Sequence, residues 1–122
     1  MALTTALNFD GNTKKAIDFY TTVFDYTLKD TDIHYWDNGL VAHAEIFIYD
    51  TKLMLADVEN DNANFSGFSL SINLTDKEKL TKIYDQLNVD AHILMPLQKT
   101  DWSDAYGLLK DQFGVTWQFN LD

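Results

Sequence analysis

The 122-residue chain carries 19 acidic and 9 basic residues, every basic one a lysine, for a formal net charge of -10. This charge disfavours nucleic acid and anionic membrane surfaces as partners, and without arginine there is no bidentate fork for phosphate groups. The chain has no cysteine, which excludes disulfides, thiolate catalysis and zinc–thiolate sites.

The N-terminal half predicts a β-α-β-β-β unit. Residues 3–9 alternate between apolar and polar side chains, as in a strand with one buried face, and Asn12 after it is the expected helix cap. A buried helical stripe then follows, at the spacing i, i+3, i+4, i+7: Ala16, Phe19, Tyr20 and Val23. Three further strands are predicted over residues 26–29, 40–49 and 53–55.

The same pattern restarts in the C-terminal half. Residues 68–74 alternate as a strand, and Thr75-Asp76-Lys77-Glu78 predicts a capping box that opens a second helix. The second stripe lies 64 residues after the first, at Leu80, Ile83, Tyr84 and Leu87. The same offset relates Leu53 to Trp117 and Leu55 to Phe119, so it holds for a helix and a strand together. We interpret it as an internal duplication.

The predicted fold is therefore α+β, with two tandem βαβββ modules that form curved mixed sheets around a central cleft and carry their helices outside. The expected domain is the whole chain, residues 1–122, with module one at 1–58, a polar linker at 59–66 and module two at 67–122. The N-terminus lacks the pattern of a signal peptide and no run is long enough for a membrane helix, so we expect a cytoplasmic protein.

Strand parity selects the side chains that face away from the helices and would line the cleft. They are Thr4, Ala6, Asn8, His43, Glu45, Met54, Ala56, Ser69, Ser71, Asn73, Thr116, Gln118 and Asn120. Met95-Pro96-Leu97, Trp102 and Tyr106 are expected on a loop-rich approach to its rim. Most of these groups are hydroxyls and amides, which suit a neutral or weakly polar small molecule. The alternative is that they are satisfied polar groups in a partly wet interior.

His43 and Glu45 form the main candidate for chemistry. At i and i+2 on one strand their side chains share a surface, where they could act as a metal pair or an acid–base pair. The alternative is a surface ion pair on an edge strand. His34 and His92 are more simply explained as exposed or core-satisfied histidines.

An ordered set of motifs adds a family resemblance that spans nearly the whole chain. The set is Leu7-Asn8-Phe9-Asp10-Gly11-Asn12, Ala16-Ile17-Asp18-Phe19-Tyr20, His43-Ala44-Glu45, Leu53-Met54-Leu55-Ala56-Asp57 and Asp111-Gln112-Phe113-Gly114-Val115. It resembles the PhnB-like branch of the vicinal-oxygen-chelate superfamily, which includes glyoxalases, extradiol dioxygenases and bleomycin and fosfomycin resistance proteins. The resemblance implies paired βαβββ modules, a homodimer, and a cleft that in metal-dependent relatives holds a divalent ion with four His/Glu-type ligands.

Those four ligand positions fall here at Thr4, Met54, Ser69 and Gln118. Hydroxyl, thioether and amide groups are poor ligands for such an ion, so we expect no metal cofactor there. The favoured hypothesis is a protein that binds a small, partly apolar molecule without metal. The alternative is a metal-dependent or acid–base enzyme, of lyase, isomerase or dioxygenase type, with a displaced site at His43 and Glu45. A third possibility is a dimer that associates with another protein.

Overall fold

The computed structural model describes residues 2–58 and 63–122, which form two compact units, Met1–Asn64 and Phe65–Asp122. The predicted module bounds, 1–58 and 67–122 with a linker at 59–66, stay a prediction, and residues 59–62 of that linker lie outside the described residues. The single domain and the shared cleft stay predictions.

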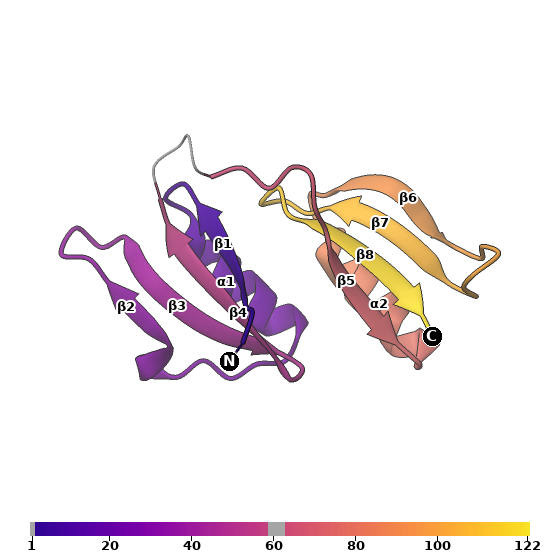
Figure 1. The fold of residues 1–122 in the computed structure, drawn as a ribbon, viewed down its shortest axis with the longest axis horizontal. Helices are drawn as coiled ribbons and strands as arrows, with labels where there is room; N and C mark the ends of the chain where they lie inside the picture. Colours follow the sequence, from indigo (N-terminus) through magenta and orange to yellow (C-terminus); the bar gives the residue numbers. More distant parts are fainter. Residues whose placement is uncertain (1, 59–62) are drawn as a thin grey trace. The chain divides into compact units, whose positions relative to one another are not determined.

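The first unit is a four-stranded mixed sheet with one long helix (Figure 1). Its elements in chain order are β1 (Thr5–Phe9), α1 (Thr13–Val23), the 3₁₀ turn η1 (Asp30–Asp32), β2 (Ile33–Tyr35), β3 (Val41–Ile48) and β4 (Thr51–Asp57). The strand order is β1-β4-β3-β2, with β1 parallel to β4 and the other neighbours antiparallel. The helix follows β1, and β2 and β3 come before the chain reaches β4, the parallel partner of β1.

The second unit repeats this plan with β5 (Leu70–Leu74), α2 (Lys77–Leu87), β6 (His92–Gln98), β7 (Tyr106–Lys110) and β8 (Thr116–Leu121). Its strand order is β5-β8-β7-β6, with β5 parallel to β8. The helices run over residues 13–23 and 77–87, which is the predicted offset of 64 at both ends. The internal duplication is therefore confirmed at the level of topology.

Each helix buries its apolar stripe against one face of its own sheet. Tyr20 and Tyr84 are 0% and 7% exposed, and the sheet residues beneath, such as Leu55 and Phe119, are also buried. Burial of one such side chain contributes about 1.5–3 kcal/mol, so the stripes account for the helix positions. One member of the predicted stripe, Phe19, is only half-buried, because Ile17 takes the inner position instead.

Two predictions next to the first helix are wrong, each because a carboxylate accepts the hydrogen bonds concerned. Residues 26–29 form no strand: Asp32 accepts hydrogen bonds from Tyr26 Oη and Lys29 N, both at 2.8 Å, so the edge strand begins only at Ile33. Asn12 makes no side-chain cap. Asp57, at the end of β4, caps the helix instead. Its Oδ1 accepts hydrogen bonds from Thr13 N at 3.2 Å and from Thr13 Oγ1 at 2.6 Å.

At the second helix the cap is Asp76, whose Oδ1 accepts from Glu78 N at 3.0 Å and Lys79 N at 3.2 Å, in place of the predicted Thr75. The predicted loop at residues 95–97 is part of the edge strand β6. Pro96 lies where the β6–β7 register shifts, which is where an edge strand tolerates a residue that lacks an N–H.

Candidate functional site

Each sheet has one face covered by its helix and one opposite face, which we call the open face. In the first unit the register aligns Ala6 with Met54 and Met54 with Glu45, so these side chains share the open face. Their neighbours along the strands, Leu53 and Leu55, are buried under α1. Thr4 lies just before β1, outside the strand.

His43 and Glu45 are in contact on this open face. His43 Nε2 lies 3.3 Å from Glu45 Oε1, and Lys52 Nζ lies 3.6 Å from the same oxygen. The three side chains are each about 40% exposed, and His34 of β2 is directly opposite His43. The strand is an inner one, between β4 and β2, so the edge-strand alternative is wrong in that detail. An exposed ion pair of this kind stabilises a protein by only about 0–1 kcal/mol.

Two aromatic residues that the sequence did not flag flank this cluster. Phe47 pairs with Lys52 across β3 and β4, and its ring lies 6.3 Å from that of Tyr26. Burial, followed by the hydrogen bond to Asp32 and the negative charges of Asp32 and Glu45, raises the pKa of the Tyr26 phenol above its usual value. Phe47 could have been found from its position two residues after Glu45; Tyr26 carries no such signal.

The open face of the second sheet is divided into a polar and an apolar half. Ser71 aligns with Gln118 and Asn73 with Asn120, which places amides and a hydroxyl on β5 and β8. Ser71 Oγ lies 3.0 Å from Asn73 Oδ1, and Asn120 Nδ2 donates to Asp122 Oδ1 at 2.6 Å. Thr116 follows on the same face of β8, whereas Ser69 lies just before β5.

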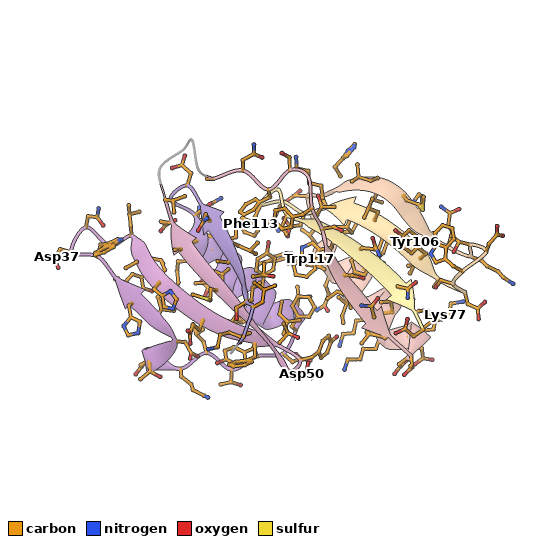
Figure 2. All side chains as sticks on the ribbon, viewed as in Figure 1. Asp37, Asp50, Lys77, Tyr106, Phe113 and Trp117 are labelled. Atoms are coloured by element: carbon orange, nitrogen blue, oxygen red, sulfur yellow. The ribbon has the colours of Figure 1, made fainter. Side chains whose placement is uncertain are left out.

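The apolar half continues the same rows onto β7 and β6. Tyr106 is opposite Asn120, and Leu108 lies between Gln118 and Met95. Trp102 packs its ring edge-on against Tyr106, which is labelled in Figure 2, at 5.2 Å between centroids, and it remains 67% exposed. An exposed indole held by a neighbouring ring is a preformed contact for a planar ligand. Leu108 was missed by sequence reasoning, although its parity with Tyr106 predicts this place.

The superfamily's metal positions do not fit a divalent ion. Within each unit the structure gives Met54 the neighbours Ala6 and Glu45, and Gln118 the neighbours Ser71 and Leu108. Among these neighbours only Glu45 supplies a carboxylate. A thioether, an amide and a single carboxylate are fewer suitable ligands than such an ion requires. Among the described residues, His, Cys, Asp and Glu form no group of three or more that could hold an ion.

Comparison with known proteins places the chain in a family. The sequence model of the family described as 3-demethylubiquinone-9 3-methyltransferase matches residues 1–120. The chain belongs to this family. We call it the PhnB-like family, because a Bacillus cereus protein whose description carries the same methyltransferase name and the name PhnB is 29% identical, with a TM-score of 0.87 over 100% of both chains.

Two further relatives define the extent of the match. Protein YjdN of Escherichia coli K12 is 32% identical over 82 residues, which are 66% of this chain and 56% of YjdN, so the chain spans little more than half of this curated relative. A glyoxylase/bleomycin resistance protein/dioxygenase domain from Frankia has a TM-score of 0.72 over 99% of this chain and 96% of its own, at 12% identity, and so shares the fold. The predicted PhnB-like branch and the paired βαβββ fold are confirmed. No helix among the described residues is long and apolar enough to cross a membrane.

Proposed function

We propose that this PhnB-like protein binds a small planar molecule on the open face of its second sheet, without the superfamily's divalent ion. One observation carries the proposal: the Trp102–Tyr106 ring pair lies beside a row of uncharged hydrogen-bonding groups that includes Gln118 and Asn120. A ligand with an aromatic ring and several polar substituents matches both halves of this face. Because the groups are uncharged, they orient a ligand and do not select for its charge.

A substituted benzoquinone or phenol ring has this mixed character. Its ring would lie against Trp102, and its oxygens would accept hydrogen bonds from the amides of Gln118 and Asn120. The family description, which names a demethylated ubiquinone, supports the same class of ligand. Catalysis by methyl transfer also needs a methyl donor, and the turn after β1, Asp10-Gly11-Asn12, does not match the glycine-rich loop of nucleotide cofactor sites. We therefore propose binding and not methyl transfer.

The test compares two aromatic variants by calorimetry. Dimethoxy-methyl-benzoquinone is titrated into EDTA-treated wild type, Trp102→Ala and Tyr49→Ala. Tyr49 is the control, because it is 42% exposed and packs edge-on against Phe24 but lies in the first unit. The loss of one ring contact predicts about two- to tenfold weaker binding for Trp102→Ala alone. Equal affinity in the three proteins, or binding that requires added zinc, would refute the proposal.

A second candidate function is a metal-dependent or acid–base enzyme that uses His43 and Glu45. The 3.3 Å contact between them, with His34 opposite, is the observation in its favour. Zinc and nickel binding by equilibrium dialysis tests it, with His43→Ala compared with His92→Ala. The latter removes an exposed histidine from β6 of the second unit. Stoichiometric metal lost only in His43→Ala would favour the enzyme; no metal bound at micromolar concentration would exclude the metal-dependent form.

We also infer that the protein forms a homodimer, as the family resemblance implies. Tyr35, Trp36 and Leu40 gather at the β2–β3 connection and are 51%, 60% and 40% exposed, and exposed apolar clusters of this kind are typical of interfaces. Light scattering after size exclusion tests this inference. Twice the monomer mass is expected, and a monomer at micromolar concentration would contradict it.

A further inference from the structure

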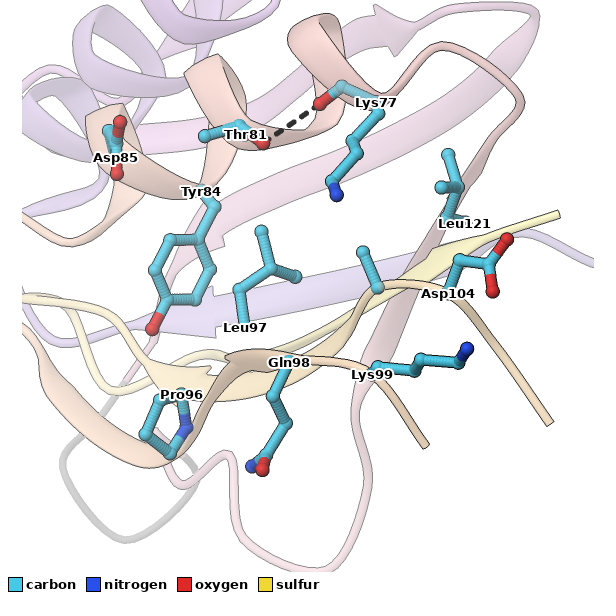
Figure 3. A pocket seen from close by; sticks show the side chains of 11 residues that line it. Lys77, Thr81, Tyr84, Asp85, Pro96, Leu97, Gln98, Lys99, Asp104 and Leu121 are labelled. Carbon is cyan, nitrogen blue, oxygen red and sulfur yellow. Dashed lines mark hydrogen bonds between the residues drawn. The ribbon is translucent and has the colours of Figure 1, made fainter. Parts of the chain in front are cut away.

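A pocket of about 790 Å³ lies within the second unit on the helix side of the sheet, between α2 and the edge strand β6 (Figure 3). Of the residues that the sequence analysis placed in or near the cleft, only Pro96 and Leu97 line it. Its apolar surface comes from Tyr84 of α2, Leu97 of β6, Ala105 and Leu121 of β8. The volume is within the range of small-molecule sites, about 300–1,000 Å³.

Tyr84 gives this pocket a hydroxyl group that forms no hydrogen bond with the described residues. The side chain is only 7% exposed, and its ring packs edge-on against Phe119 at 5.1 Å. A buried tyrosine hydroxyl normally finds a partner, but the Tyr84 hydroxyl makes no hydrogen bond to the described part of the chain. No fully buried polar atom of the described residues lacks a partner, so this hydroxyl is reached from the pocket.

The charged groups give the pocket two different ends. Lys77, Thr81 and Asp85 lie at i, i+4 and i+8 along one side of α2, with Lys77 in the first turn and Asp85 two turns later. Figure 3 shows the Lys77 side chain extending from the helix into the pocket. Its ammonium forms no ion pair with the described residues. Lys99 and Asp104 also line the pocket and add one charge of each sign.

We propose that this pocket binds an elongated amphipathic carboxylate that carries a hydroxyl group at its far end. The carboxylate pairs with Lys77, the aliphatic body lies on Leu97 and Ala105, and the hydroxyl bonds to Tyr84. Lys77 and Tyr84 are seven residues apart on one helix, about 10 Å along its axis, which sets the length of the ligand. This site is on the face of the sheet opposite to Trp102 and does not depend on the function proposed above.

The probe is 10-hydroxydecanoate, titrated below its micelle-forming concentration into uniformly ¹⁵N-labelled protein. We expect amide shifts in α2 and β6. Lys77→Gln should weaken binding about three- to fivefold, the effect of one exposed ion pair. Lys82→Gln, an exposed lysine of the same helix outside this pocket, should leave it unchanged.

The phenylalanine variant separates the hydroxyl contact from the packing. Tyr84→Phe should weaken 10-hydroxydecanoate about two- to tenfold and leave decanoate unchanged, because only the former has a partner for the phenol. Decanol, which lacks the charge, should bind more weakly than decanoate. Equal binding of decanol and decanoate, shifts confined to residues around Trp102, or no shift at millimolar probe would each overturn the proposal.

Discussion

Replacement of Asp57 by alanine should destabilise the first unit by about 2–4 kcal/mol. The carboxylate caps α1 through Thr13 and also accepts from Val41 N at 2.8 Å, so it joins the helix start to β3 and β4. Loss of a helix cap costs about 0.5–2 kcal/mol. Thr13 and Val41 are 0% and 1% exposed, so water does not replace the lost acceptor, and an unsatisfied buried donor costs about 1–3 kcal/mol more.

The assay is urea unfolding followed by far-ultraviolet circular dichroism, with the free energy of unfolding extrapolated to water. Asp57→Asn should fall between wild type and Asp57→Ala, because its oxygen can still serve Thr13 while its amide nitrogen cannot accept from Val41. Asp37→Ala is the control, since Asp37 is exposed in the same unit. An unfolding free energy for Asp57→Ala within about 0.5 kcal/mol of that for Asp37→Ala, the usual range for neutral surface changes, would refute this role of Asp57.

Three further substitutions test individual side chains. Asp111→Ala should cost the second unit about 2–4 kcal/mol in urea unfolding, because the buried carboxylate accepts from Trp117 Nε1 at 2.8 Å and from two backbone N–H groups. Gly107→Ala should reduce the free energy of unfolding by roughly 1–3 kcal/mol, because a Cβ there would lie 3.2 Å from the Leu97 Cα. In calorimetry this loss should lower the Tm by several degrees. The raised pKa of Tyr26 means that the folded state holds the phenol proton more tightly, so its stabilisation is complete below pH 10.0 and is lost as pH rises through the folded pKa. Above pH 10.0 the unfolding free energy of Tyr26→Phe should therefore fall less steeply than that of wild type, and parallel curves would contradict this.

The sequence predicted the elements whose signal is periodic. The stripes that contain Tyr20 and Tyr84 repeat every helical turn, and the alternation around Leu55 and Phe119 repeats every second residue, so burial follows from spacing alone. The same parity placed Gln118 and Asn120 on the face opposite α2. The offset of 64 residues then predicted that the two units would share one topology.

The features that the sequence did not predict depend on contacts between distant residues. Asp57 caps a helix that begins 44 residues earlier, so no local motif reports it, and Asn12 was the better local candidate. Tyr26 and Asp32 form a local hydrogen bond that replaces a strand ladder. The helix-side pocket depends on where β6 lies beside α2, which neither segment encodes alone.

The most direct test of the central claim is a map of where a planar ligand binds. Dimethoxy-methyl-benzoquinone is added to EDTA-treated, ¹⁵N-labelled protein, and the amide shifts are assigned to residues. We expect shifts concentrated at Trp102, Tyr106, Gln118 and Asn120, with the same pattern before and after zinc is added. Shifts that arise only with zinc, or that centre on His43 and Glu45, would contradict it.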